Sequence, residues 1–379
     1  MSVPLKRNVS LLSGNEAVAR GAYEAGVRVA SAYPGTPSTE ILENLARYEG
    51  VYAEWAPNEK VAVEVALGGS MAGVRSLAAM KHVGVNVAAD PIFTASYTGV
   101  RGGFVIVTAD DPELHSSQNE QDNRHYAAAA KIPMLEPSDS HEAKEYTRLA
   151  FDLSERFDTP VFLRTTTRIS HATGAVTLGD GSPPPIPPGF VRDPAKWVML
   201  PVNAKRRHAA VEERTRALKE FAETFPENRI EWGDRSLGIV TGGVSYQYAR
   251  EAFPDASVLK LGMAYPLPER LVREFAAGVS RVVVVEELDP YLETHVKSLG
   301  IPAQGKDLIP IVGELDPRIV RQGIAGEAVR LRTPEEVPAR PPNLCPGCPH
   351  RGLFFVLKKF GAVVAGDIGC YTLAALPPL

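Results

Sequence analysis

The regular alternation of short β-rich runs with helical patterns between residues 8 and 170 constrains the fold more than any other feature of the sequence. Four runs predict buried strands: VRVASAY (27–33), SLAAM (76–80), FVIVTAD (104–110) and PVFLRTT (160–166). Helical patterns occupy the stretches 14–26, 37–48, 58–73 and 139–157. Because strands that alternate with helices form a parallel sheet covered by helices on both faces, the sequence predicts an α/β fold here.

Proline-rich segments divide the rest of the chain. GDGSPPPIPPGF (179–190) is typical of a stiff connector, and a charged helix is expected at about 205–224. A second α/β unit begins with strand, glycine turn and helix at residue 236, and a third, after RTPEEVPARPPN (332–343), holds only one helix and one strand. We therefore expect a first domain at 1–178, a linker with a crossover helix at 179–235, a second domain at 236–330, and a linker with a truncated third domain at 331–379. The last part looks cut, or another chain completes it.

Composition excludes several classes of protein. With a net charge of −4, the chain has no electrostatic reason to bind nucleic acid or an anionic membrane. It contains no run of about 18 uncharged apolar residues, and its N-terminus lacks the apolar core of a signal peptide, so we expect a cytoplasmic protein. The 3 cysteines are too few for a disulfide framework.

A glutamate at the start of an apolar helix is the first sign of a functional site. On a helix of about 3.6 residues per turn, Glu59 heads a stripe of small residues. The members of this stripe are Ala62, Ala66, Gly69, Ser70 and Gly73. Such a stripe allows another backbone or a flat ligand to approach closely, whereas Glu64 is expected to pair with Lys60 on the surface. Glu59 is either a first-turn glutamate favoured by the helix dipole or a buried functional carboxyl.

Three predicted strands end in polar or glycine-bearing loops. YPGTPSTEI follows the first, with Thr36 expected as the N-cap and Pro37 as the first residue of a helix whose N–H groups suit an anion. KHVGVN and DPELHSSQNEQDNR follow the other two, and Lys81 and His82 close their strand. Because ligands of open α/β sheets bind beyond these strand ends, the loops predict a binding site, although each could be a simple capped turn.

Several motifs together resemble one enzyme family. They are YPGTPSTEI, N-E-x-x-A-x-x-x-A-x-G, MKHVGVNVAADP, HSSQNEQDNR, LCPGCPHRG and GDIGCYTLAALPP. In this order, and along nearly the whole chain, they resemble the 2-oxoacid:ferredoxin oxidoreductases that depend on thiamine diphosphate, and the large (alpha) subunit of the indolepyruvate type in particular. The resemblance implies a pyrimidine-binding domain, a transketolase-C-terminal-like domain and the start of a diphosphate-binding domain. The motif that holds Mg²⁺ and diphosphate, and the ferredoxin-like tail, are absent from this sequence.

The resemblance gives Glu59 a catalytic role. In this cofactor class a carboxyl shares a proton with N1′ of the aminopyrimidine, which favours the tautomer that deprotonates the thiazolium. Burial on an apolar helix face would keep such a carboxyl partly protonated, because desolvation raises its pKa. The stripe of small residues would then receive the pyrimidine ring or a partner subunit.

The resemblance also implies a set of binding residues. Those assigned to the cofactor are Tyr33, Pro34, Gly35, Glu59 and His82. Thr36 and the helix N-terminus would hold the substrate carboxylate, although Thr36 could be a plain N-cap. Gly35 would leave room for an aromatic substrate side chain. HSSQNEQDNR is too polar to be core, and its Arg124 could contact either the substrate or the partner chain. His82 could equally be a hydrogen-bonded loop histidine.

The cysteines leave two interpretations open. Cys345, Cys348 and Cys370 supply one thiol fewer than a complete cluster or zinc site requires. In related oxidoreductases matching thiols hold an iron–sulfur cluster, so a 4Fe-4S cluster is one interpretation, and three unligated cysteines are the other. The ligands of Mg²⁺ would lie mostly outside this chain.

The expected function is that of the thiamine-binding alpha subunit of an arylpyruvate:ferredoxin oxidoreductase. Its partners would be the 2-oxoacid substrate, coenzyme A, ferredoxin and a smaller beta subunit, in a homo- or hetero-oligomer with its active site at an interface. The chain by itself is expected to be inactive. The alternatives are a non-redox thiamine-dependent decarboxylase and a non-catalytic scaffold subunit.

Overall fold

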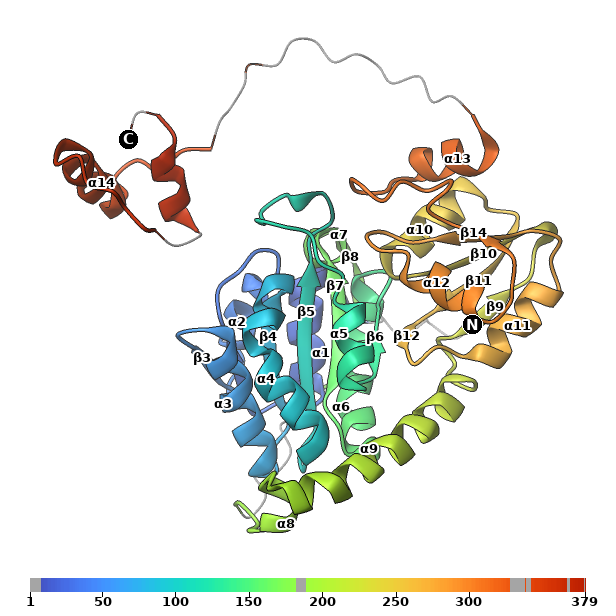
Figure 1. Ribbon diagram of the computed structural model, residues 1–379, viewed down its shortest axis with the longest axis horizontal. Coiled ribbons are helices and arrows are strands. Elements are labelled where there is room, and N and C mark those ends of the chain that lie inside the picture. The colour runs from blue at the N-terminus through green and yellow to red at the C-terminus, as the bar shows by residue number, and fades with distance from the viewer. Residues whose placement is uncertain (1–7, 182–188, 328–337, 339–341, 367–368, 378) are drawn as a thin grey trace, which may run out of the picture. The chain divides into compact units, whose positions relative to one another are not determined.

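The protein divides into two compact units, Met1–Ala328 and Val329–Leu379. The structure, a computed structural model, describes residues 8–181, 189–327, 338, 342–366, 369–377 and 379 (Figure 1). Much of the two proline-rich segments predicted at 179–190 and 332–343 therefore lies outside the described residues. In the part of the chain that is described, no helix is long and apolar enough to cross a membrane.

The larger of the two main sheets in the first unit has seven strands (Figure 1). Its strands are β2 (Val29–Ala32), β3 (Tyr52–Trp55), β4 (Ser76–Lys81), β5 (Phe104–Asp110), β6 (Met134–Leu135), β7 (Val161–Thr166) and β12 (Met263–Tyr265). Their order is β12-β6-β7-β5-β4-β2-β3. All neighbours are parallel except β12 and β6, which are antiparallel. The predicted α/β fold with a parallel sheet is thereby confirmed.

Helices cover both faces of this sheet (Figure 1). One face packs against α1 (Gly14–Glu24), α2 (Thr39–Leu45) and α6 (Ser140–Phe157). The other packs against α3 (Glu59–Met71), α4 (His82–Thr98) and α5 (Arg124–Ala130). Side chains that accept backbone N–H groups fix the starts of α1, α3 and α6, at Ser13, Asn58 and Asp139.

The prediction that KHVGVN forms a loop after the strand SLAAM is wrong. β4 ends at Lys81 and α4 begins directly at His82, so KHVGVN is the first part of a helix. Gly84, the glycine of the predicted loop, lies inside this helix. Position 84 requires a glycine, because α3 lies so close that a side chain here would collide with Glu59.

A second sheet follows a long helix, α9 (Pro201–Ala222). Its strands are β9 (Arg229–Glu231), β10 (Asp234–Gly242), β11 (Ala256–Leu261), β13 (Val282–Val285) and β14 (Ala303–Gln304), in the order β14-β13-β10-β11-β9. Its helices are α10 (Gly243–Ala252), α11 (Glu269–Ala277), α12 (Tyr291–Ser298) and α13 (Pro317–Ala325). Since β12 leaves this region to pair with β6, the two sheets are physically joined.

Smaller elements complete the described structure. β1 (Val9–Ser13) and β8 (Thr173–Thr177) form an antiparallel pair. The short helices are η1 (Pro112–Leu114), α7 (Thr167–His171) and α8 (Pro194–Trp197). The second unit contains α14 (Pro349–Lys359) and η2 (Cys370–Ala375).

Candidate active site at the start of α3

Glu59 is buried at the first position of α3. Asn58 caps the helix by accepting the N–H of Val61 at 3.0 Å, which sets the direction in which Glu59 enters the first turn. Only 8% of Glu59 is exposed. Its carboxyl lies against Gly84 of α4, where an added Cβ would come within 2.6 Å of Glu59 Cγ and Oε1. The first turns of two helices therefore enclose this carboxyl.

The environment of Glu59 favours its protonated form. Burial raises the pKa of the Glu59 carboxyl, while its own backbone N–H and the Lys81 ammonium act in the opposite direction. A carboxyl in this position retains a proton at higher pH than a surface glutamate does. It can therefore share a proton with a ring nitrogen, which an ionised surface carboxylate does poorly.

The stripe of small residues is covered by the protein itself, contrary to the expectation that it receives a ligand or a partner. Ala62, Ala66 and Ser70 are fully buried. A Cβ at Gly69 would lie 3.1 Å from Val29 and 2.8 Å from the Ser76 hydroxyl, on strands β2 and β4. Small side chains here allow α3 to pack closely against its own sheet. Of the residues on this stripe, Glu59 is therefore the candidate for a catalytic role.

Glu64 is exposed, as the helical periodicity predicts. The expected partner differs, because the Lys60 ammonium lies 3.6 Å from Asp90 of α4. Lys60 therefore bridges the two helices at the surface, on the far side of α3 from the buried residues.

The loop that precedes α2 has a different cap from the one predicted. α2 begins at Thr39 with Ser38 before it, so Thr36 is not an N-cap and Pro37 is not helical. A turn explains the difference: the N–H and hydroxyl of Ser38 both donate to Gly35 O at 2.9 Å. Thr36 and Pro34 are exposed, and Tyr33 is half-buried.

The space beside Gly35 is filled, whereas the sequence suggested room for a substrate side chain. A Cβ at Gly35 would lie 3.0 Å from Lys81 Cδ and 3.1 Å from Lys81 Cγ. Because β2 and β4 are neighbours in the sheet, the loop after β2 meets the residue that ends β4. Gly35 thus makes room for Lys81.

His82 is fully buried next to Lys81. Its Nε2 lies 2.9 Å from Asn119 O, and its Nδ1 has no hydrogen-bond partner among the described residues. This arrangement is that of a histidine which holds the loop after β5, and a contact with cofactor stays a prediction.

Arg124 lies in a buried ionic cluster. Its guanidinium donates to both carboxylate oxygens of Asp122 and, at 2.7 Å, to Glu286. It also donates to the backbone oxygens of Glu287 and Asp289. With 2% of Arg124 exposed, these partners occupy its guanidinium, and contact with a substrate would require it to exchange them.

The three cysteines do not form a cluster of ligands in the described part of the second unit. Cys345 and Cys370 are exposed and Cys348 is half-buried. Among the described residues, the groups of three or more potential ligand atoms within 4.8 Å of one another contain carboxylates and histidines but no cysteine. The residues present, with 3 cysteines in the sequence, do not fit a complete four-thiolate cluster.

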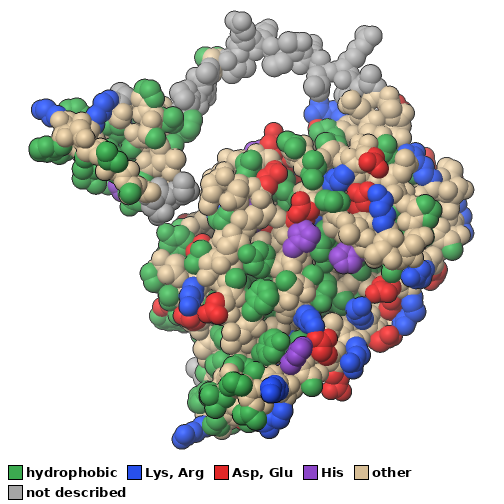
Figure 2. All heavy atoms as spheres, in the orientation of Figure 1, with side chains coloured by type: hydrophobic (Ala, Val, Ile, Leu, Met, Phe, Trp, Pro, Cys, Tyr) green, Lys and Arg blue, Asp and Glu red, His purple; other side chains and the backbone are tan. Residues whose placement is uncertain are grey.

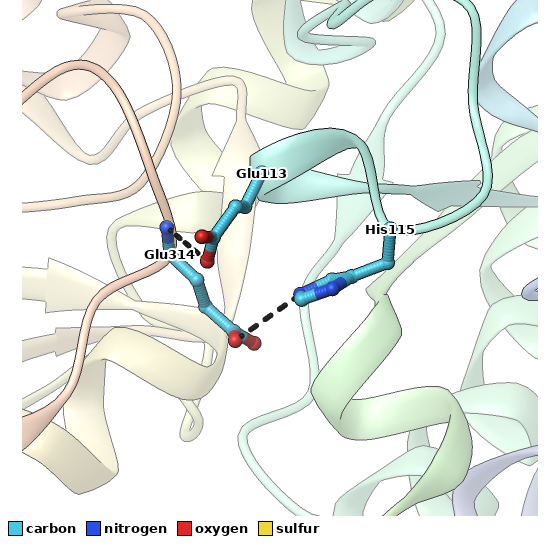
Figure 3. A group of neighbouring side chains, drawn as sticks. All are labelled: Glu113, His115 and Glu314. Carbon is cyan, nitrogen blue, oxygen red and sulfur yellow. Dashed lines mark hydrogen bonds and ion pairs between the residues drawn. The ribbon is translucent and has the colours of Figure 1, made fainter. Parts of the chain in front are cut away.

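The described residues contain two such groups. Glu113 and His115, from the loop after β5, meet Glu314, which precedes α13 (Figure 3). Glu314 is already paired with Arg168, which weakens its attraction for a cation. The second group, Asp122, His125 and Asp289, includes a carboxylate that Arg124 occupies.

Gly84 and the ionic cluster around Arg124 are the parts of this region that sequence reasoning missed. Gly84 could have been found from its position three residues after a strand end, had that segment been interpreted as helical. The cluster had no local signal, because Arg124 and Glu286 are 162 residues apart.

Comparison with known proteins places this geometry in context. Residues 20–184 match the family described as "Pyruvate flavodoxin/ferredoxin oxidoreductase, thiamine diP-bdg". The chain is 46% identical to indolepyruvate oxidoreductase subunit IorA of Thermococcus kodakarensis, over 97% of this chain and 63% of that protein. It is 44% identical to IorA of Archaeoglobus fulgidus, over 97% and 64% respectively. The chain thus spans just under two thirds of the length of these curated relatives.

A solved structure has the same fold. It is a 2-oxoglutarate:ferredoxin oxidoreductase from Magnetococcus marinus with 2-oxoglutarate, coenzyme A and succinyl-CoA bound. The TM-score is 0.71 at 17% identity, over 86% of this chain and 66% of that one. The names of these relatives give no support to a non-redox decarboxylase or a scaffold subunit.

Proposed function

Because the chain belongs to the 2-oxoacid:ferredoxin oxidoreductase family, we propose that it is the thiamine-binding alpha subunit of an arylpyruvate:ferredoxin oxidoreductase of the indolepyruvate type. The overall reaction converts a 2-oxoacid and coenzyme A into an acyl-CoA and CO₂. It releases two electrons, which reduce two molecules of ferredoxin, and one proton. The names of the relatives support this substrate class.

The buried carboxyl of Glu59 carries the proposal. It lies at the carboxyl-end edge of the sheet, against a glycine, with a raised pKa. These are the properties required of a group that holds a proton at N1′ of an aminopyrimidine. When bound, thiamine diphosphate supplies the carbon nucleophile and electron sink that decarboxylation of a 2-oxoacid requires.

The residues around Glu59 would form one side of the cofactor site. Tyr33, Pro34 and Gly35 lie in the loop at the end of the adjacent strand β2. Gly84 allows Glu59 to turn toward α4, and the two helices keep water from most of the carboxyl. The residues that bind Mg²⁺ and the diphosphate would come mainly from outside this chain.

Another subunit would cover the surface formed by the end of β3 and by α4. Trp55 at the end of β3 and Val87 and Phe93 of α4 are exposed, and hydrophobic side chains show on this face (Figure 2). Exposed apolar side chains beside a cofactor site support an interface with another subunit. A smaller beta subunit, ferredoxin and coenzyme A complete the proposed set. The three cysteines would hold a cluster only with a fourth ligand from elsewhere.

The test is reduction of a viologen dye by the complete enzyme that contains this chain, with thiamine diphosphate, Mg²⁺ and coenzyme A. We expect kcat/KM for indolepyruvate and phenylpyruvate to exceed those for pyruvate and 2-oxoglutarate. A preference for 2-oxoglutarate would contradict the substrate class, and no reduction with any 2-oxoacid would contradict the proposed function.

A further inference from the structure

A 2-oxoacid substrate carries a carboxylate, which needs a cation or strong hydrogen-bond donors at the edge of the sheet that would hold the cofactor. The two groups that the sequence offered are poorly suited. α2 begins at Thr39 and has only 7 residues, with Thr36 outside it. Arg124 is held by Asp122 and Glu286. The cation must therefore be sought among the other residues around Glu59.

Lys81 is such a cation. It is the last residue of β4 and directly precedes α4, the helix whose Gly84 contacts the Glu59 carboxyl. Its methylene groups pack against Gly35, which has no side chain to displace them. Lys81 thus stands between the loop after β2 and the start of α4, at the same edge of the sheet as Glu59.

The Lys81 ammonium retains donors for a ligand. One of its three hydrogens goes to Ser116 O at 2.7 Å. Among the described residues it forms no ion pair within 4.0 Å, although the carboxylates of Glu59 and Asp111 are near enough to interact with it electrostatically. The Asp111 carboxylate is itself bonded to Ser117 and Thr167, each at 2.6 Å.

We propose that the Lys81 ammonium binds the carboxylate of the 2-oxoacid, and so holds the substrate at the edge of the sheet where Glu59 also lies; this inference rests on the proposed function. Gly35 is then a specificity element of a different kind from the one that the sequence suggested. It does not widen the pocket for an aromatic ring but allows the lysine stem to lie flat across the loop. The loop after β5 holds the ammonium through Ser116 O.

Kinetics of Lys81→Met in the complete enzyme test the assignment. Methionine keeps an unbranched side chain against Gly35 and removes the charge. We expect KM for the 2-oxoacid to rise about 10- to 100-fold, as for loss of a charged hydrogen bond, with KM for coenzyme A unchanged. The matched control is Lys60→Met, which removes the same charge from the surface of α3 and should leave both values unchanged.

A neutral competitor separates recognition of charge from general damage to the site. In the methyl ketone that corresponds to the arylpyruvate, a methyl group replaces the carboxylate. Its inhibition constant should be the same in wild type and Lys81→Met, while the constant for a non-reactive arylacid bearing the carboxylate should rise. Equal losses for both competitors, or no rise for the acid, would overturn the assignment of Lys81.

The two proposals fail in different ways. If wild type turns over another 2-oxoacid in place of arylpyruvates, the substrate class is wrong. In that case, a higher KM for that 2-oxoacid in Lys81→Met still supports the binding role of the lysine. If wild type prefers arylpyruvates but Lys81→Met has an unchanged KM, the proposed function stands and the role of Lys81 is wrong.

Discussion

At the scale of single residues, the environment of one carboxyl determines what the chain can do. Glu59 and Glu64 lie five positions apart on the same helix, yet Glu59 is buried and Glu64 is exposed. Burial raises the pKa of Glu59, so this carboxyl holds its proton more tightly than an exposed glutamate does. An identical side chain on the opposite face of α3 is exposed to solvent.

We expect Glu59→Gln to lower kcat of the complete enzyme by at least about 100-fold, because an amide cannot share the proton. Stability should not fall, since the substitution removes a carboxyl that burial disfavours in its charged form. Viologen reduction and thermal unfolding measure the two effects. Glu64→Gln is the control and should change neither, and an equal loss of activity in both variants would mean that Glu59 is not the proton carrier.

At the scale of elements, glycine and other small residues allow helices α3 and α4 to pack closely. The small residues of α3 seat it on β2 and β4, and Gly84 lets α4 approach the start of α3. Both helices begin at the same edge of the sheet, because parallel strands all end there. The close approach is what buries Glu59.

We expect Gly84→Ala to reduce activity about 10-fold or more, since its Cβ would come within 2.6 Å of Glu59 Cγ and Oε1 and displace the carboxyl. Gly68→Ala is the matched control: Gly68 lies in α3, and a Cβ there meets nothing within 4 Å. That variant should be fully active and about 0.5–1 kcal/mol more stable, as alanine favours a helix. Full activity of Gly84→Ala would show that Glu59 tolerates displacement.

At the scale of the whole molecule, the two sheets of the first unit are joined through a buried ionic cluster. Arg124 connects Asp122 to Glu286, which follows β13 of the second sheet. Arg164 of β7 binds Asp110 and Glu136 nearby. Such a cluster adds little free energy compared with apolar packing, but loss of one member leaves its partners charged and unpaired.

We expect Arg124→Met to destabilise the protein by about 3–5 kcal/mol, because Asp122 and Glu286 lose their shared cation in a buried site. Urea denaturation measures the change. Arg270→Met is the control, since Arg270 is exposed and pairs with the exposed Glu220. Its loss should leave the free energy of unfolding nearly unchanged, because solvent screens this exposed pair. A cost for Arg124→Met as small as that of the control would mean that the cluster does not hold the sheets together.

The pH dependence of stability should reveal a further buried carboxyl at this junction, Glu287. Burial raises the pKa of Glu287 from 4.5 to about 7, while the Leu315 N–H partly opposes the shift. Because the folded protein binds this proton more tightly than the unfolded chain, the free energy of unfolding falls as pH rises from 4.5 to about 7. The full effect is about 3 kcal/mol.

We expect Glu287→Gln to lose this part of the pH dependence, because glutamine does not ionise and still accepts the Leu315 N–H. Urea denaturation at intervals between pH 4.5 and 8 measures the difference from wild type. If Glu287→Gln follows the wild-type curve, the Glu287 carboxyl titrates alike in the folded and unfolded chain.

The sequence by itself determined the parallel sheet, the positions of its strands β2, β4, β5 and β7 and of helices α1, α2, α3 and α6, and the helical face that Glu59 shares with the small residues. These follow from periodicity, which depends only on neighbours along the chain: β5 spans Phe104–Asp110, as the apolar run FVIVTAD predicts. Only the tertiary structure decided what covers each face. It placed Val29 and Ser76 against the small stripe of α3, Lys81 beside Gly35, and Glu286 against Arg124. Those contacts join residues far apart in the sequence, and local sequence patterns do not show which distant side chains will be in contact.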